Sequence, residues 1–201
     1  MPEKPPSNQL GFDFPVDDLV ARERVFFAAF LEARAAQGAH VAGHRLRRIH
    51  ALSGSVLDPG RMHVTLAMLG NYRRETPPAV VDMAKRVASR ARFGAFDVVF
   101  DRAATFVSDK PKRPLVMLGG KGVSSFVALH RGLGVLFGEA GLTHGPAAEF
   151  TPHVTLLYDR RIVPPQAVEP VSWRVTEFTL VRSLLGRTVH IPLERWALAG
   201  G

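Results

Sequence analysis

Residues 63–66 read His-Val-Thr-Leu, and the same four residues recur 90 positions later in the chain. Both copies lie in apolar stretches that favour a β-strand. Side chains two positions apart share one face of a strand, so His63 and Thr65 would point one way and the apolar residues between and after them the other. His153 and Thr155 repeat this arrangement. If the two strands lie side by side, two imidazoles and two hydroxyls converge on one small volume.

Two histidines facing one group can perform acid and base catalysis together. An unperturbed imidazole has a pKa of about 6.5, so one ring can be neutral while the other is protonated near neutral pH. At a phosphodiester, the neutral ring takes a proton from water and the protonated ring gives one to the departing sugar oxygen. Threonine hydroxyls can donate to the non-bridging oxygens, where charge concentrates. This chemistry requires no metal ion or cofactor. A single His-x-Thr occurs often by chance, so its duplication is the informative feature.

The two motifs resemble the paired H-x-T-hydrophobic motifs of the 2H phosphoesterase superfamily, in particular its branch of 2′-5′ RNA ligases and RNA 2′,3′-cyclic phosphodiesterases. The resemblance also includes an early strand at residues 25–28, the Phe-Thr-Pro-His approach at 150–153 and the closing stretch 178–183. It covers residues 24 to 198 of the chain.

The resemblance implies an α+β, bilobal fold in which two antiparallel sheets line a central cleft, with helices on the outside and a pseudo-two-fold relation between the lobes. It implies hydrolysis of 2′,3′-cyclic phosphate ends of RNA or nucleotides to 2′-phosphates, with ATP-independent 2′-5′ RNA ligation as a further activity. His63 and His153 would be the acid–base pair, and Thr65 and Thr155 would bind phosphate. We assign His63 as the acid and His153 as the base that activates water.

One position departs from the family pattern. Bacterial members of this branch often carry an arginine five residues after the second motif histidine, whereas this chain has Tyr158, followed by Arg160 and Arg161. Tyr158 is a candidate substrate-binding residue that could stack on a base or donate to phosphate. Packing of an aromatic ring at the cleft rim is the equally weighted alternative.

The surrounding sequence predicts the elements that must position these residues. Pro77-Pro78 opens one amphipathic helix, and Gly141 is a plausible cap at the end of another. Gly38 and Gly43 are expected to interrupt an early helix, and Gly70-Asn71 to form a turn. The expected helices are 32–52, 77–88 and 124–140; the expected strands are 25–30, 61–69, 95–106, 115–118, 150–158, 173–181 and 188–193.

Composition sets the remaining expectations. The 201 residues, 46% of them hydrophobic, suit an extended, proline-rich tail at 1–18 and one bilobal domain at 19–201. The absence of cysteine excludes disulfides and thiolate chemistry. No apolar run is long enough to span a membrane, and we expect a cytoplasmic monomer without a protein partner. The net charge of +8 favours RNA or nucleotides as the partner. The alternatives are an RNA- or tRNA-binding module that uses the same basic cleft without turnover, and a coincidental pair of motifs in an unrelated α+β fold.

Other candidate residues carry weaker signals. His40 and His44 have the spacing of metal ligands on a helix, but no acidic third ligand is in register, so a solvated basic face is the preferred interpretation. The arginines at 45–48 could follow an RNA backbone. The glycine-rich stretch 119–122 lacks the register of a phosphate loop and is expected to be a turn. A solvated connector is the default for the basic residues of the 108–113 loop. Four histidines receive no role: His50, His130, His144 and His190.

Overall fold

The structure is a computed structural model that describes residues 22–141 and 150–200. The predicted tail and His144 lie outside these residues. No helix of the described ranges is long and apolar enough to cross a bilayer. The elements run in the order β1 (Glu23–Phe30), α1 (Ala33–Ile49), a 3₁₀ turn (Pro59–Arg61), β2 (His63–Tyr72), α2 (Pro78–Ala88), β3 (Phe96–Thr105), β4 (Arg113–Gly119), α3 (Val123–Glu139), β5 (His153–Asp159), β6 (Gln166–Val175), β7 (Glu177–Leu184) and β8 (Val189–Ala197).

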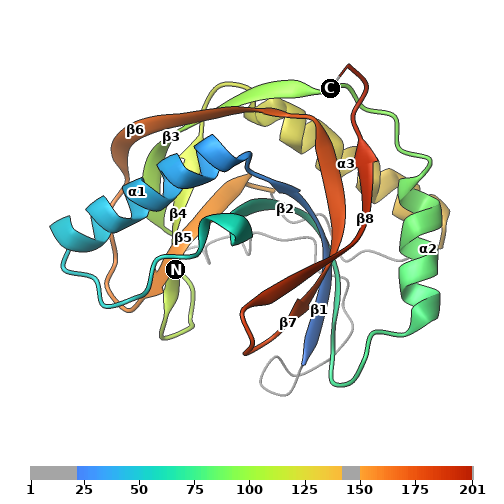
Figure 1. The fold of residues 1–201 in the computed structure, drawn as a ribbon, viewed down its shortest axis with the longest axis horizontal. Coiled ribbons are helices and arrows are strands. Elements are labelled where there is room, and N and C mark those ends of the chain that lie inside the picture. The colour runs from blue at the N-terminus through green and yellow to red at the C-terminus, as the bar shows by residue number, and fades with distance from the viewer. Residues whose placement is uncertain (1–21, 142–149, 201) are drawn as a thin grey trace, which may run out of the picture.

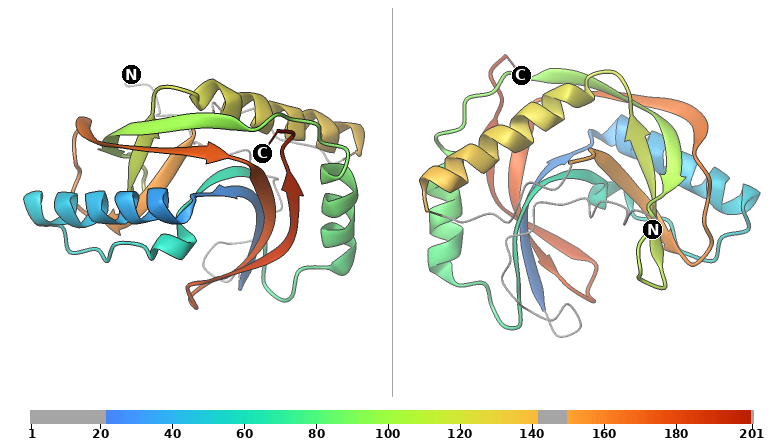
Figure 2. Two further views of the ribbon diagram at one scale, coloured as in Figure 1. Left: turned by 45° about the horizontal axis from the view of Figure 1, so that its top comes forward. Right: turned by 180° about the vertical axis from the view of Figure 1, so that it is seen from behind.

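All the described strands belong to one sheet of eight, in the order β6-β3-β4-β5-β2-β1-β7-β8. The sheet curves into an arch, as Figures 1 and 2 show from three sides. The prediction of an α+β fold is correct, but the prediction of two separate sheets is wrong. The single sheet consists of two halves of four strands each. They are joined where β2 pairs with β5, through Val64 and Val154. This junction is a single antiparallel pair of residues.

The two halves share a strand–helix–strand plan around the junction. In one half β1 leads through α1 to β2, and β2 pairs with β1. In the other half β4 leads through α3 to β5, and β5 pairs with β4. Each H-V-T-L strand is therefore the inner strand of its half and follows a helix. The duplicated H-V-T-L motifs of the sequence thus lie at equivalent positions in the two halves of the sheet.

Alternation along β1 divides its apolar side chains between the two faces of the sheet. Val25, Phe27 and Ala29 are fully buried in the main core, which also contains the apolar faces of the three helices. Phe26 and Ala28 belong to a smaller cluster with Val181, flanked by Phe30 and Met68. Residues of opposite parity on a strand face opposite sides, so this smaller cluster lies on the face turned away from the main core.

Three local expectations were wrong. Helix α1 is continuous rather than interrupted at its glycines. These glycines allow the helix to pack closely on its neighbours, since a Cβ at Gly43 would lie 2.7 Å from Val56 Cγ1. Gly70 and Asn71 lie inside β2 rather than in a turn after it. The strand expected at 173–181 is two strands, β6 and β7, which are separated at Thr176.

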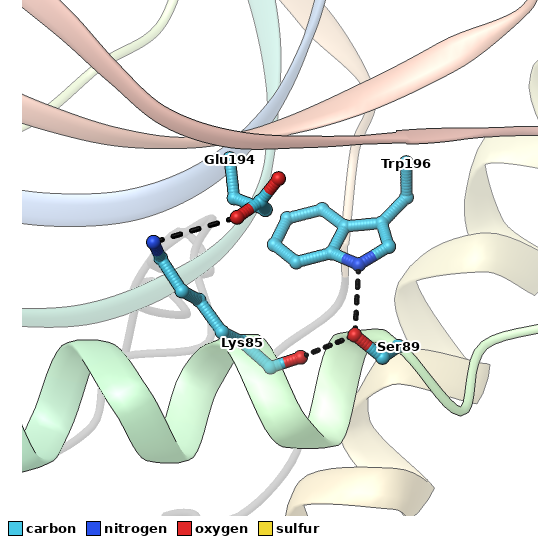
Figure 3. Close-up of polar contacts among 4 residues, drawn as sticks. All are labelled: Lys85, Ser89, Glu194 and Trp196. Carbon is cyan, nitrogen blue, oxygen red and sulfur yellow. Dashed lines mark hydrogen bonds and ion pairs between the residues drawn. The ribbon is translucent and has the colours of Figure 1, made fainter.

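Helix α2 fixes the last strand of the sheet from the outside (Figure 3). Trp196 of β8 donates its indole N–H to Ser89 Oγ at 3.2 Å, and this hydroxyl donates to Lys85 O at 2.9 Å. Lys85 Nζ also lies 3.4 Å from Glu194 Oε2. The Trp196 ring packs on Phe27 and Phe178 of the core, with centroids 5.8 and 5.3 Å apart. Strand β8 is thus tied both to α2 and to the core.

Candidate active site

The two motif histidines are the first residues of the two strands that meet at the centre of the sheet. His63 opens β2 and His153 opens β5. The antiparallel pairing of Val64 with Val154 places His63 on the side of Thr155, and His153 on the side of Thr65. Val64 and Val154 are buried, whereas the four motif residues on the other face are partly exposed. The predicted convergence of the motifs is therefore present in the fold.

Each motif histidine is held by the same backbone device. His63 Nδ1 donates to Arg61 O at 2.6 Å, and His153 Nδ1 donates to Thr151 O at 2.8 Å. A carbonyl oxygen can only accept, so Nδ1 carries the hydrogen in both rings. The neutral imidazole then has its lone pair on Nε2. Both rings are thereby fixed in orientation and tautomer, and Nε2 is the atom that remains for proton transfer.

A cleft of about 640 Å³ contains all five of the predicted site residues. His63, Thr65, His153 and Thr155 line its centre from β2 and β5, and Tyr158 lines it from the end of β5 with 49% of its surface exposed. The lining also includes polar and basic residues from the neighbouring strands, the 3₁₀ turn before β2 and the β3–β4 loop: Arg24, Arg61, Ser108, Lys110, Lys112, Ser183 and His190. The cleft is thus both large enough for a nucleotide and rich in groups that favour an anion.

Aromatic rings and cations surround His63. Its ring stacks on Phe26 at 5.1 Å and lies 5.4 Å from Phe30. A third histidine, His190 of β8, meets it edge-on at 5.3 Å. Burial, together with repulsion by His190, His153 and Arg61, lowers the pKa of His63 to about 4, although the bond to Arg61 O opposes this. His63 is therefore neutral in the free protein near neutral pH.

His153 has a simpler environment. One aromatic ring, that of Phe106 from the segment after β3, lies edge-on at 4.8 Å. Burial lowers the pKa of His153, and the bond to Thr151 O opposes this. No cation of the described residues contributes to that shift, in contrast to His63. Positive charge is consequently easier to place on His153 than on His63.

A buried carboxylate connects the cleft rim to the end of α1. Asp159, the residue after Tyr158, accepts bonds from Ser53 N (2.6 Å) and Gly54 N (2.7 Å) at Oδ2, and from Arg161 N (2.9 Å) at Oδ1. Burial alone would raise its pKa, but these bonds lower it to about 2. A Cβ at Gly54 would collide with Tyr158 O, so this approach of the chain needs glycine. Tyr158, which precedes Asp159 in β5, is therefore held close to the segment that follows α1.

Of the weaker sequence candidates, Lys110 and Lys112 of the β3–β4 loop line this cleft, whereas those on α1 and before α3 lie outside it. His40 Nδ1 contacts Leu57 O at 2.9 Å and its Nε2 lies 3.1 Å from that of His44; no group of three or more potential metal ligands forms among the described residues. Gly122 lies in the turn before α3, as expected, with φ of 79°. Exposed arginines of α1 line a separate hollow of about 640 Å³: Arg45, Arg47 and Arg48.

Two of the histidines without an assigned role have structural partners. His130 is buried, with Nδ1 2.6 Å from Leu66 O and its ring stacked on Phe150 at 4.0 Å. His50 Nε2 lies 2.8 Å from Gln166 Nε2.

Sequence reasoning overlooked two residues that lie beside His63. Arg61 could have been found, because it lies two positions before His63 within the stretch 61–69 that the sequence predicts as a strand; in the structure it ends the 3₁₀ turn before β2. His190 offered no local signal. Its position depends on the β7–β8 hairpin, which pairs it with Ser183, and on the β1–β7 register, which pairs Ser183 with Arg24 of the cleft.

Comparison with known proteins agrees with this geometry. Residues 35–187 match the model of the 2′-5′ RNA ligase superfamily. The RNA 2′,3′-cyclic phosphodiesterase of Escherichia coli (strain K12) is 30% identical over 190 residues, which cover 88% of this chain and 97% of the relative.

Solved structures show the same arch. E. coli LigT in its apo form superposes with a TM-score of 0.68 at 27% identity, over 89% of this chain and 98% of LigT. LigT complexed with 3′-AMP gives 0.65 at 27% identity, over 89% and 99%. The protein TT0787 of Thermus thermophilus gives 0.68 at 26% identity, over 87% and 97%. With its duplicated motifs joined at the centre of the sheet, the chain belongs to the 2′-5′ RNA ligase superfamily.

Proposed function

We propose that this protein is a metal-independent phosphoesterase that hydrolyses 2′,3′-cyclic phosphates at RNA ends or on nucleotides to 2′-phosphates. The observation that carries the proposal is the matched pair of histidines, each fixed through Nδ1 and each lining the same cleft. The relative from E. coli that bears the name RNA 2′,3′-cyclic phosphodiesterase supports the same substrate class. ATP-independent 2′-5′ RNA ligation is a further activity that the family name suggests.

In the proposed reaction, a water oxygen attacks phosphorus and the bond from phosphorus to the 3′ oxygen breaks. One histidine accepts a proton from the water, and the other donates a proton to the 3′ oxygen, which leaves a 2′-phosphomonoester. We assign His63 as the base and His153 as the acid, the reverse of the sequence-based assignment. Burial and the neighbouring Arg61 and His190 disfavour a proton on His63, whereas no such cation of the described chain acts on His153.

Thr65 and Thr155 are proposed to donate to the non-bridging oxygens. The pairing of Val64 with Val154 places one hydroxyl beside each histidine, so the phosphate can be held between both halves of the site. Donors aimed at oxygens that gain charge stabilise the transition state more than the bound substrate. Tyr158 is proposed to contact the nucleoside, because its ring lines the cleft and is half exposed.

The direct test is turnover of a 2′,3′-cyclic mononucleotide, with the product identified by phosphorus NMR. We expect a 2′-phosphate, an activity unchanged by EDTA, and a loss of about 100- to 10,000-fold in His153→Ala. Arg86→Ala is a suitable control, because this exposed residue lies on α2, outside the cleft. No turnover by the wild type, or full turnover by His153→Ala, would contradict the proposal.

The hollow beside α1 favours a second candidate function, RNA binding without turnover. Three exposed arginines line it, and clustered cations bind nucleic acid by displacing counterions from phosphates. This alternative predicts RNA binding that weakens steeply with salt, survives replacement of both motif histidines, and is accompanied by no phosphodiester cleavage. Binding assays on the His63→Ala and His153→Ala variants separate the two functions.

We also propose that the protein acts as a monomer in the cytoplasm, without a protein partner, as the sequence suggests. Light scattering coupled to gel filtration tests the monomer directly. A stable dimer at micromolar concentration would contradict it.

A further inference from the structure

Arg61 combines three properties that the catalytic pair does not use. Its carbonyl holds His63, while its side chain lines the cleft. Its Nε is buried and has no hydrogen-bond partner among the described residues. Its positive charge acts on both His63 and His190. Buried donors are almost always bonded, so an unsatisfied guanidinium nitrogen in a cleft indicates an acceptor that arrives with a ligand.

His190 of β8 also has a buried ring nitrogen beside His63. Its ring lies edge-on to both His63 and Phe26, with centroids 5.3 and 5.7 Å away. Its Nδ1 is buried and makes no well-formed hydrogen bond to the described part of the chain, although the backbone of Val189 lies close enough to raise the pKa of the ring. Burial and the charge of Arg61 lower its pKa to about 4, although the Val189 backbone opposes this, so the ring is neutral in the free protein at neutral pH. An anion beside it would favour the protonated form, in which both ring nitrogens donate.

The two unsatisfied nitrogens belong to side chains that both act on His63, and this limits the ligand that can satisfy them. The ligand must accept hydrogen bonds, because both nitrogens can donate. It must also carry negative charge, because it would lie between the Arg61 guanidinium and the protonatable ring of His190. Phosphate oxygens meet both requirements. The other basic groups that line the cleft come from β1 and the β3–β4 loop: Arg24, whose Nε donates to Asn71 Oδ1 at 2.7 Å, Lys110 and Lys112. None of them contributes to the shift of His63.

We propose that Arg61 and His190 form an anion-binding pair that holds the non-bridging oxygens of the phosphate under attack at His63. This inference rests on the proposed function and adds two substrate-binding residues to it. The pair has no equivalent in the other half, where Thr151 occupies the position that corresponds to Arg61, two residues before the motif histidine. The phosphate is therefore held more tightly on the β2 side of the cleft than on the β5 side.

The test measures phosphate binding and turnover separately in Arg61→Gln, His190→Gln and Arg61→Lys. Arg187→Gln is the matched control, because it removes one positive charge from an exposed residue in the same hairpin as His190, outside the cleft. Thermal melting shows that each variant is folded. The substrates are a 2′,3′-cyclic mononucleotide, which carries only the reacting phosphate, and the same nucleotide with an added 5′-phosphate.

We expect Arg61→Gln and His190→Gln to raise KM for the mononucleotide about tenfold and to lower kcat as well, because donors to these oxygens also stabilise the transition state. The calorimetric Kd of inorganic phosphate should weaken by the same factor. Arg61→Lys keeps the charge but loses the fork of donors, so we expect an intermediate loss. Arg187→Gln should match the wild type.

Unchanged phosphate binding in folded Arg61→Gln and His190→Gln would overturn the proposal. A loss confined to the 5′-phosphorylated substrate would also overturn it, because the pair would then hold a neighbouring phosphate. Calorimetry with inorganic phosphate needs no turnover, so the pair can be tested even if the wild type hydrolyses no cyclic phosphate and the proposed function fails.

Discussion

The two halves of the cleft hold their histidines identically but surround them differently. Both rings donate Nδ1 to the carbonyl two residues earlier, and both begin the inner strand of their half. Around His63, however, there are Phe26, Phe30, His190 and Arg61, whereas one ring, Phe106, lies against His153. The duplicated backbone supplies two equivalent positions, and the unduplicated neighbours distinguish them.

This difference suggests how one repeated motif can supply both an acid and a base. Acid and base catalysis at one phosphate needs two rings with different proton affinities. Strand geometry cannot provide that difference, because it is the same in both halves. The charges beside each ring can, and in this protein they accumulate on the side of His63.

The largest expected effect is the loss of activity when a motif histidine is replaced. Comparing substrates whose leaving groups do and do not need a proton shows which histidine is the acid. His153→Asn should lose about 1,000-fold on a 2′,3′-cyclic nucleotide, but far less on an aryl phosphodiester, whose leaving group needs no proton. His63→Asn should lose activity on both substrates, since water must still be activated. Rescue of His63→Asn instead of His153→Asn by the aryl substrate would reverse our assignment.

The pH dependence of kcat/KM reports the same asymmetry in the free enzyme. His63 must be neutral, so activity should fall on the acid side as pH drops through its pKa of about 4. His153 must be protonated, and its pKa is lowered from 6.5, so activity should fall as pH rises above a value below 6.5. Beyond that value we expect a loss of about tenfold per pH unit. Arg61→Gln should shift the acid limb to higher pH. A profile that is flat from about pH 5 to about pH 8 would contradict the assignment of His153 as the acid.

The threonines test whether the phosphate is shared equally between the halves. Replacing one hydroxyl by a methyl group, in Thr65→Val or Thr155→Val, should lower kcat/KM about 10- to 100-fold. If Arg61 and His190 hold the phosphate toward β2, the two losses should differ, because the remaining donors are unevenly distributed. Equal losses in steady-state kinetics would indicate a symmetric phosphate and weaken the comparison.

Substitutions of Tyr158 should have the smallest effect on KM. They distinguish stacking of its ring on a base from binding of its hydroxyl to phosphate. If its ring stacks on a base, Tyr158→Phe should be neutral and Tyr158→Ala should raise KM for a cyclic nucleotide about threefold to tenfold. If its hydroxyl binds phosphate, Tyr158→Phe should carry the loss. KM unchanged in both variants would leave it a packing residue at the rim.

The sequence was sufficient to predict the parts of this molecule that depend on local pattern. The apolar stretches 61–69 and 150–158 predict two strands, and alternation puts His63 with Thr65, and His153 with Thr155, on one face of each. In the structure β2 and β5 begin at the two histidines. The amphipathic spacing after Pro77-Pro78 predicted α2 within one residue. Gly141, with φ of 74°, follows the end of α3 as expected.

Features that depend on long-range pairing could not be predicted. The merging of two sheets into one rests on the single pair Val64 and Val154. Gly38 and Gly43 do not break α1, because tertiary packing against Val171 and Val56 outweighs their low helix propensity. His190 reaches His63 only through the registers of β7 and β8, which no local pattern reveals.

The central claim, that two H-V-T-L halves form one acid–base site, is tested most directly by kcat/KM of His63→Ala, His153→Ala and the double variant on a 2′,3′-cyclic nucleotide. We predict that each single variant loses about 100- to 10,000-fold and that the double variant is little worse, because residues that act as a unit are not additive. Wild-type activity in either single variant, or losses that multiply in the double variant, would contradict the account.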